Sequence, residues 1–260
     1  MNQNFHTSED DYKKVDSLNT SLSSDKLRGD SNLLEFADNE DRIGFVKKVY
    51  AILASQLTLT FGFVAVVKAN ESLNDALPEQ VGLLWTALIL GICIEISLVC
   101  CKSVARKSPT NMILLALFTF CWTYVIGAIC ALYSAEVVLT AALMTMVLSI
   151  SLMVYAYFTK TDFTTCCGPF VCWGLLLIMT ISMLMSVISM LVFSYTATWY
   201  PFAAGFGVIV GGLFLLIDTQ LIVGGRRHEL SIDDYVLGAL MLYLDIIYIF
   251  LELLKLFGRK

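Results

Sequence analysis

Two aspartates stand inside long apolar segments near the end of the chain, Asp218 within residues 202–223 and Asp245 within residues 235–257. A charged side chain at the centre of a bilayer costs roughly 2.5–3.5 kcal/mol on insertion scales, so such groups persist where they meet a partner, water or an ion. A short loop joins the two segments, so their helices should be neighbours. Two facing carboxylates cannot both ionise cheaply and would share a proton, which makes the pair a candidate protonation switch.

The depths of the two aspartates in the membrane are not the same. Asp218 lies five residues from the loop and Asp245 ten, which corresponds to roughly 7 and 15 Å at 1.5 Å per residue. Helix tilt would close part of this gap. The alternative is two separate acids, each bonded to a hydroxyl or an amide. If the carboxylates do meet, their oxygens are also suitable ligands for a hard cation.

Three further charged residues lie in apolar segments, namely Glu95, Glu252 and Lys255. The two acids, Glu95 and Glu252, are secondary candidates for a functional site. Glu252 and Lys255 are three residues apart near a helix end, so we expect them to pair and to extend toward the interface. Glu95 lies one or two helical turns from the end of its segment. It either reaches water there or acts as a cation ligand or a pairing partner.

The elements that must position these groups are membrane spans. The chain is 58% hydrophobic and 15% charged, against about 25% charged for an average soluble domain. Seven segments have close to the roughly 20 apolar residues that cross a bilayer: Val49–Val67, Val81–Cys101, Asn111–Tyr133, Val137–Phe158, Phe170–Ser194, Phe202–Val223 and Tyr235–Phe257. We therefore predict an all-α, polytopic membrane protein with a seven-helix bundle.

The sequence divides into a polar tail and a membrane domain. Residues 1–40 are rich in Asp, Ser and Asn and predict a disordered tail, which leaves residues 41–260 as the membrane domain. Lys and Arg follow spans two, four and six, whereas the loops after spans one, three and five hold only Lys68. The positive-inside rule then places the N-terminus in the cytosol. The basic residues at the C-terminus conflict with this rule, because seven full spans would place them on the far side of the membrane. Span seven therefore either crosses fully, against the rule, or is re-entrant.

The net charge of −5 and the absence of a basic stripe argue against nucleic acid as a partner. No C-x-x-C pair occurs among the eight cysteines, so no zinc site is expected. Four cysteines form two pairs at predicted cytosolic helix ends, a reducing compartment in which disulfides are rare. Juxtamembrane cysteines are candidates for palmitoylation, and here they are Cys100, Cys101, Cys166 and Cys167.

Five segments carry a resemblance to a known family: DRIGFVKKVYAILASQLTLT (41–60), KSPTNMILLALFTF (107–120), YAYFTKTDFT (155–164), LFLLIDTQLIVGG (213–225) and LSIDDYVLGALMLYLDIIYIFLELLKL (230–256). In this order they closely resemble the Bax inhibitor/lifeguard family, the transmembrane Bax inhibitor motif proteins. The likeness covers residues 41–257, and its last segment is the most specific.

The resemblance implies a pH-regulated calcium leak channel with a role in calcium homeostasis and in the suppression of cell death. The family's paired aspartates map onto Asp218 and Asp245, which would be both sensor and calcium ligands. Bacterial relatives have a basic residue in span two that latches this pair, whereas span two here holds only Glu95. The implied partners are the bilayer, calcium as the permeant ion and apoptosis-regulating membrane proteins, with no cofactor. The expected membrane is the endoplasmic reticulum, the Golgi or another endomembrane rather than the plasma membrane.

Two other functions fit some of the same features. Presenilin-type intramembrane aspartyl proteases also have one aspartate in each of two consecutive late spans. In those proteases the first aspartate lies in a Tyr-Asp motif and the second in a Gly-x-Gly-Asp motif. This chain has Ile217-Asp218 and Tyr243-Leu244-Asp245 instead, so we expect no enzyme. A non-conducting membrane protein that binds apoptotic partners remains open.

Overall fold

The computed structural model describes residues 40–166, 180–188, 200–225 and 229–258. The chain divides into two units, Met1–Gly44 and Phe45–Lys260, and the fold below is that of the second. Secondary structure in the described residues is helical throughout. The predicted disordered tail lies outside them, apart from Glu40.

Six described helices are long and apolar enough to cross a membrane: Glu40–Ala69, α3 (Val81–Cys100), α5 (Thr110–Ala131), α6 (Ala135–Phe158), α8 (Tyr200–Val223) and α9 (Tyr235–Phe257). Shorter elements join them: α2 (Glu71–Glu79), α4 (Lys102–Ala105) and the 3-10 turns η1 (Phe163–Cys166) and η2 (Ile232–Asp234). The prediction of an all-α polytopic membrane protein is confirmed. Of the fifth predicted span, Phe170–Ser194, only residues 180–188 are described, and they are helical.

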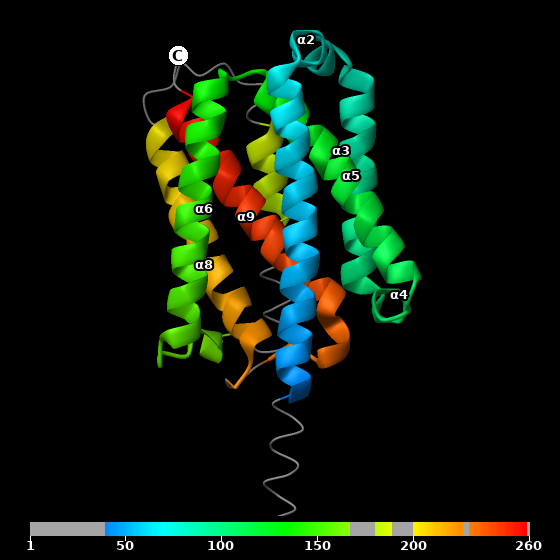
Figure 1. The fold of residues 1–260 in the computed structure, drawn as a ribbon, viewed down its shortest axis with the longest axis vertical. Helices are drawn as coiled ribbons and strands as arrows, with labels where there is room; N and C mark the ends of the chain where they lie inside the picture. The colour runs from blue at the N-terminus through cyan, green and yellow to red at the C-terminus, as the bar shows by residue number, and fades with distance from the viewer. Residues whose placement is uncertain (1–39, 167–179, 189–199, 226–228, 259–260) are drawn as a thin grey trace, which may run out of the picture. The chain divides into compact units, whose positions relative to one another are not determined.

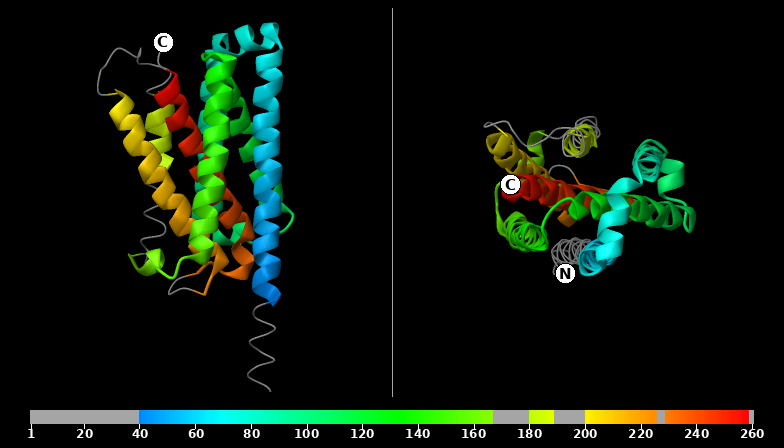
Figure 2. Two further views of the ribbon diagram at one scale, coloured as in Figure 1. Left: turned by 60° about the vertical axis from the view of Figure 1, so that its left-hand side comes forward. Right: turned by 90° about the horizontal axis from the view of Figure 1, so that it is seen from above.

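Helix α9 is the core of the bundle. Within its most apolar stretch 94% of the residues are buried, against 22% for α6. It packs against α5, α6 and α8, and the view from above in Figure 2 shows it between the other helices. A helix enclosed by protein can carry polar groups that lipid would exclude. The position of α9 therefore explains how one helix holds Asp245, Glu252 and Lys255.

The two ends of the bundle carry different connections. The turns after α3, α6 and α8 lie at one end in Figure 1, and α2 and the α5–α6 turn lie at the other. Gly258, directly after α9, lies against Tyr133 of the α5–α6 turn. Helix α9 therefore runs through the whole bundle as one uninterrupted helix. Its 23 residues are long enough for a full crossing of the membrane.

Two elements extend beyond the apolar segments that predicted them. The first long helix begins at Glu40 rather than Val49, because helix formation continues through polar residues that hydropathy alone leaves out. Residues 71–79 form α2, although their polarity predicts a loop. The Asn70 side chain accepts a hydrogen bond from the Leu73 N–H at 3.3 Å, so it caps the first turn of α2.

Candidate functional site

The structure brings Asp218 and Asp245 together. Helices α8 and α9 pack against each other, and they bring the two carboxyl groups close enough to interact directly. Both residues are buried, and Oδ2 of Asp245 has no hydrogen-bond partner among the described residues. Helix α9 runs obliquely to the bundle axis (Figure 1), so ten residues along it rise less than in an upright helix. Tilt thus closes the depth difference that the sequence suggests.

Glycines on α8 let this helix approach α9 closely. A Cβ on Gly211 would lie 2.8 Å from Cδ1 of Tyr248, and a Cβ on Gly207 would lie 2.7 Å from Cδ of Glu252. Both distances are shorter than carbon atoms tolerate, so a larger residue at either position would force its neighbour on α9 to shift. Gly207 and Gly211 form a G-x-x-x-G sequence, a spacing that allows membrane helices to pack closely.

Glu252 and Lys255 form a pair, as expected, with 2.5 Å between Lys255 Nζ and Glu252 Oε1. They do not extend to the interface, however, because both side chains are buried within the chain. The hydroxyl of Ser186 donates a second hydrogen bond to Glu252 Oε1 at 3.0 Å. The expectation of a solvated pair is wrong because α9 is central, so even its last turns are covered by neighbouring helices.

Glu95 on α3 is buried too and does not reach water. The hydroxyl of Thr180 donates a hydrogen bond to its Oε1, and its Oε2 has no partner among the described residues. No contact of the described residues joins Glu95 to Asp218 or Asp245. The structure therefore places Glu95 as a separate buried acid, not as a third member of the aspartate pair.

Two sets of buried hydroxyl and amide contacts among the first long helix, α5 and α9 escaped the sequence interpretation. The Thr60 hydroxyl lies 2.9 Å from the hydroxyls of both Thr123 and Tyr243, and Gln56 donates to Thr119 at 2.9 Å. All five side chains are buried. The sequence did contain a signal for these contacts. Gln56 and Thr60, like Thr119 and Thr123, are four residues apart and so lie on one face of a helix. The contacts of Thr60 reach α9 at Tyr243, which lies two residues before Asp245 in the sequence.

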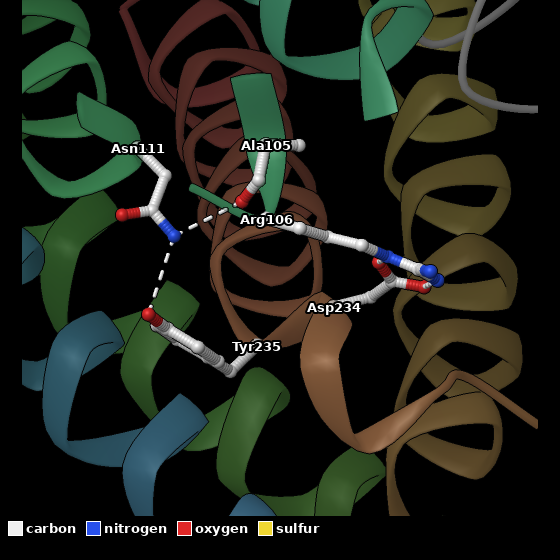
Figure 3. A network of polar contacts seen from close by, with 5 residues as sticks. All are labelled: Ala105, Arg106, Asn111, Asp234 and Tyr235. Carbon is white, nitrogen blue, oxygen red and sulfur yellow. Dashed lines mark hydrogen bonds and ion pairs between the residues drawn. The ribbon is translucent and has the colours of Figure 1, made fainter. Parts of the chain in front are cut away.

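A second polar network fastens the start of α9 to the turn that follows α3 (Figure 3). Arg106 donates from Nε to Asp234 Oδ1 at 2.7 Å and from Nη2 to Oδ2 at 2.8 Å. The Asn111 amide donates to the carbonyl of Ala105 at 3.0 Å and to the Tyr235 hydroxyl at 3.2 Å. The hydrogen bond to Asp234 raises the pKa of the Arg106 guanidinium, which therefore stays charged. The basic residue Arg106 after span two thus contacts the start of α9 rather than the aspartate pair.

The cysteine candidates are only partly described. Cys100 and Cys101 are exposed free thiols. Cys166 ends η1, and Cys167 lies outside the described residues. The described part of the chain holds no group of three or more His, Cys, Asp or Glu side chains that could bind a metal.

Comparison with known proteins finds one matching family and several similar proteins. Residues 42–260 match the protein family described as Inhibitor of apoptosis-promoting Bax1. The chain is 36% identical over 226 residues to Protein lifeguard 3 of Homo sapiens, which covers 87% of this chain and 72% of the human protein. It is 34% identical to Protein lifeguard 3 of Mus musculus over the same shares. A BI1-like protein of Arabidopsis thaliana is 31% identical over 225 residues, which is 85% of this chain and 83% of the plant protein.

Proposed function

Because the chain belongs to the Bax inhibitor/lifeguard family of apoptosis-regulating membrane proteins, we propose that it is a pH-regulated calcium leak of an intracellular membrane. In this role it helps to set calcium levels and suppresses cell death, without enzymatic activity. The observation that carries the proposal is the buried position of Asp218 and Asp245 close to each other on two packed helices.

The proton shared by the two aspartates is the proposed switch. With one proton between them, one carboxyl group donates to the other and holds α8 against α9. Loss of that proton leaves two adjacent negative charges in a low-dielectric interior, where they repel each other strongly. Since α9 is the core of the bundle, separation of α8 from α9 opens the interior and gives a cation a path.

The same two carboxylates would attract the permeant ion. Calcium takes 6–8 oxygen ligands, of which Asp218 and Asp245 supply a part and water the rest. A site with few protein ligands binds weakly, which suits an ion that must leave again. Glu95 and Glu252 are secondary acids in this proposal, and Glu252 is occupied by the ammonium of Lys255.

The orientation follows from the distribution of charge. The turns after α3, α6 and α8 lie at one end of the bundle (Figure 1), and in the sequence Lys or Arg follows each of the three spans that end there. We place this end in the cytosol, in an endomembrane such as the endoplasmic reticulum or the Golgi. Protease treatment of sealed vesicles should remove an N-terminal tag, and full protection of the tag would reverse the orientation.

Cys100 and Cys101 would then be exposed thiols at the cytosolic interface, where we propose reversible palmitoylation, with Cys166 and Cys167 as further candidates. The exposure of the first two thiols supports this. Acyl-exchange labelling of the protein from cells should detect a thioester at this pair. A result in which every thiol is free would exclude it.

Calcium entry into liposomes that contain only this protein tests the proposed function. Entry should depend on the amount of protein and should change with pH between about pH 5 and pH 8. Empty liposomes and liposomes with the Asp218→Asn variant serve as controls. No entry at any pH would favour a non-conducting interaction protein. Cleavage of a membrane-spanning peptide that either aspartate variant abolishes would favour the presenilin-type protease.

A further inference from the structure

The surface between the first long helix and α6 is hollowed. A cavity of about 770 Å³ lies there, with walls that run from Leu57 to Ala69 on one side and from Ala135 to Met153 on the other. Figure 1 looks onto this side of the bundle, with α9 behind the two helices. Ile246 of α9 contributes to the lining. We call this space the lateral groove.

Its position and lining point to a ligand from the bilayer. The side chains that line the groove are almost all apolar, and its rim on α6 includes Leu139, Leu143 and Ile150, which are about half exposed. In a membrane-spanning helix such side chains face lipid tails, so the groove opens sideways into the hydrocarbon. The lining on α6 covers 18 residue steps, about 27 Å at 1.5 Å per residue, close to the roughly 30 Å thickness of the hydrocarbon core. An extended acyl chain matches this shape and polarity.

One end of the groove carries a positive charge. Lys68 lines it and donates to Asn74 Oδ1 at 2.8 Å, to the Tyr133 carbonyl at 2.5 Å and to the Ala131 carbonyl at 3.4 Å. All three acceptors are neutral, so no carboxylate of the described residues compensates the charge of the ammonium group. This end also lies at the α5–α6 turn, the level at which we expect lipid headgroups.

The groove holds one further polar group that lacks a partner. Thr58 and Thr145 donate to carbonyls of their own helices, but the buried hydroxyl of Ser149 has no hydrogen-bond partner among the described residues. Unsatisfied buried hydroxyls are rare in folded proteins. An acyl chain can neither donate a hydrogen bond to this hydroxyl nor accept one from it, so the hydroxyl gives no support to a lipid tail at that position.

We propose that the lateral groove binds one glycerophospholipid, with its phosphate at Lys68 and one acyl chain along α6. The argument is independent of the calcium leak, because it rests on the apolar lining, the uncompensated cation and the length of the groove. The bound chain would contact Ile246, the residue after Asp245, so the lipid reaches the central helix.

Native mass spectrometry of the delipidated full chain tests the site, with dioleoylphosphatidylglycerol as the probe and dioleoylglycerol as the phosphate-free comparison. Ala142→Trp fills the groove and should abolish binding of both lipids. Val147→Trp is the matched control, since it adds the same side chain to the exposed face of α6 outside the groove. Equal binding by both tryptophan variants would show only non-specific lipid at the surface and would overturn the proposal.

The headgroup contact has its own variants. Lys68→Gln keeps donors for the nearby carbonyls but removes the charge, so affinity for phosphatidylglycerol should fall about tenfold while dioleoylglycerol binding stays unchanged. Lys68→Arg keeps the charge and should restore binding. Unchanged phosphatidylglycerol binding by Lys68→Gln would contradict the placement of the phosphate. A lipid-free dimer that Ala142→Trp dissociates would identify a second copy of the chain as the occupant instead.

Discussion

Asp218 of α8 and Asp245 of α9 lie close together in the buried interior of the bundle, although each sits in a helix of apolar residues. A hydrogen bond between two carboxyl groups requires that one of them carries a proton. The contact between these helices is therefore tied to proton occupancy, and separate measurements can test this link.

The first prediction concerns the single variants Asp218→Asn and Asp245→Asn. An amide still forms a hydrogen bond with the remaining carboxyl group but has no proton to lose, so the like-charge repulsion disappears. Each variant should therefore flatten the dependence of calcium flux on pH, measured with a calcium dye in liposomes between about pH 5 and pH 8. Glu136→Gln is the control, because this carboxylate is exposed in the first turn of α6. A wild-type pH profile in both aspartate variants would contradict the switch.

The second prediction concerns coupling between the two aspartates. If they share one proton, the double variant Asp218→Asn/Asp245→Asn should give a flux profile like that of one single variant. Groups in one network typically show interaction energies of roughly 0.5–3 kcal/mol in a double-mutant cycle. A second double-mutant cycle compares the free energy of unfolding of the wild type, the two single variants and the double variant. Strictly additive effects in both measurements would mean that the carboxyl groups act independently.

The third prediction concerns the buried pair of Glu252 and Lys255. Lys255→Met leaves the Glu252 carboxylate buried without its counter-charge, which should lower the free energy of unfolding by about 3–5 kcal/mol. Adding Glu252→Gln removes the second charge and should recover most of the loss, because neutral groups fill the same space. Thermal unfolding in one detergent compares the variants. A double variant no more stable than Lys255→Met would show that packing, and not charge, explains the loss.

The fourth prediction concerns the ion pair of Arg106 and Asp234, which fastens the turn after α3 to the start of α9 (Figure 3). Arg106 is substantially exposed, so the pair is worth only about 0.2–1 kcal/mol. Arg106→Gln should reduce stability by that amount, and less in high salt because ions screen the charges. The charge swap Arg106→Asp/Asp234→Arg should restore part of it. Lys107→Gln, at the exposed neighbouring position, is the control and should have little effect.

Local chemistry decided the spans, the turns and the identity of the buried acids. Transfer of a segment from water to lipid depends on its own residues, so hydropathy alone located six described helices and the tight α5–α6 turn, where Ser134 caps α6. The same reasoning selected Asp218 and Asp245, because an acid in an apolar segment is conspicuous whatever surrounds it. The proximity of the two followed from a short loop and antiparallel neighbours.

What only the tertiary structure decided is which face of each helix is covered. Helices α3, α5, α6 and α8 are apolar on all sides, so their residue patterns did not indicate an inward face. The central position of α9 depends on packing among helices distant in sequence. That position buries Glu252 and Lys255 together, connects Tyr243 to Thr60 and leaves a groove beside Ile246. Hydropathy sums over one segment at a time and carries no information about partners from other segments.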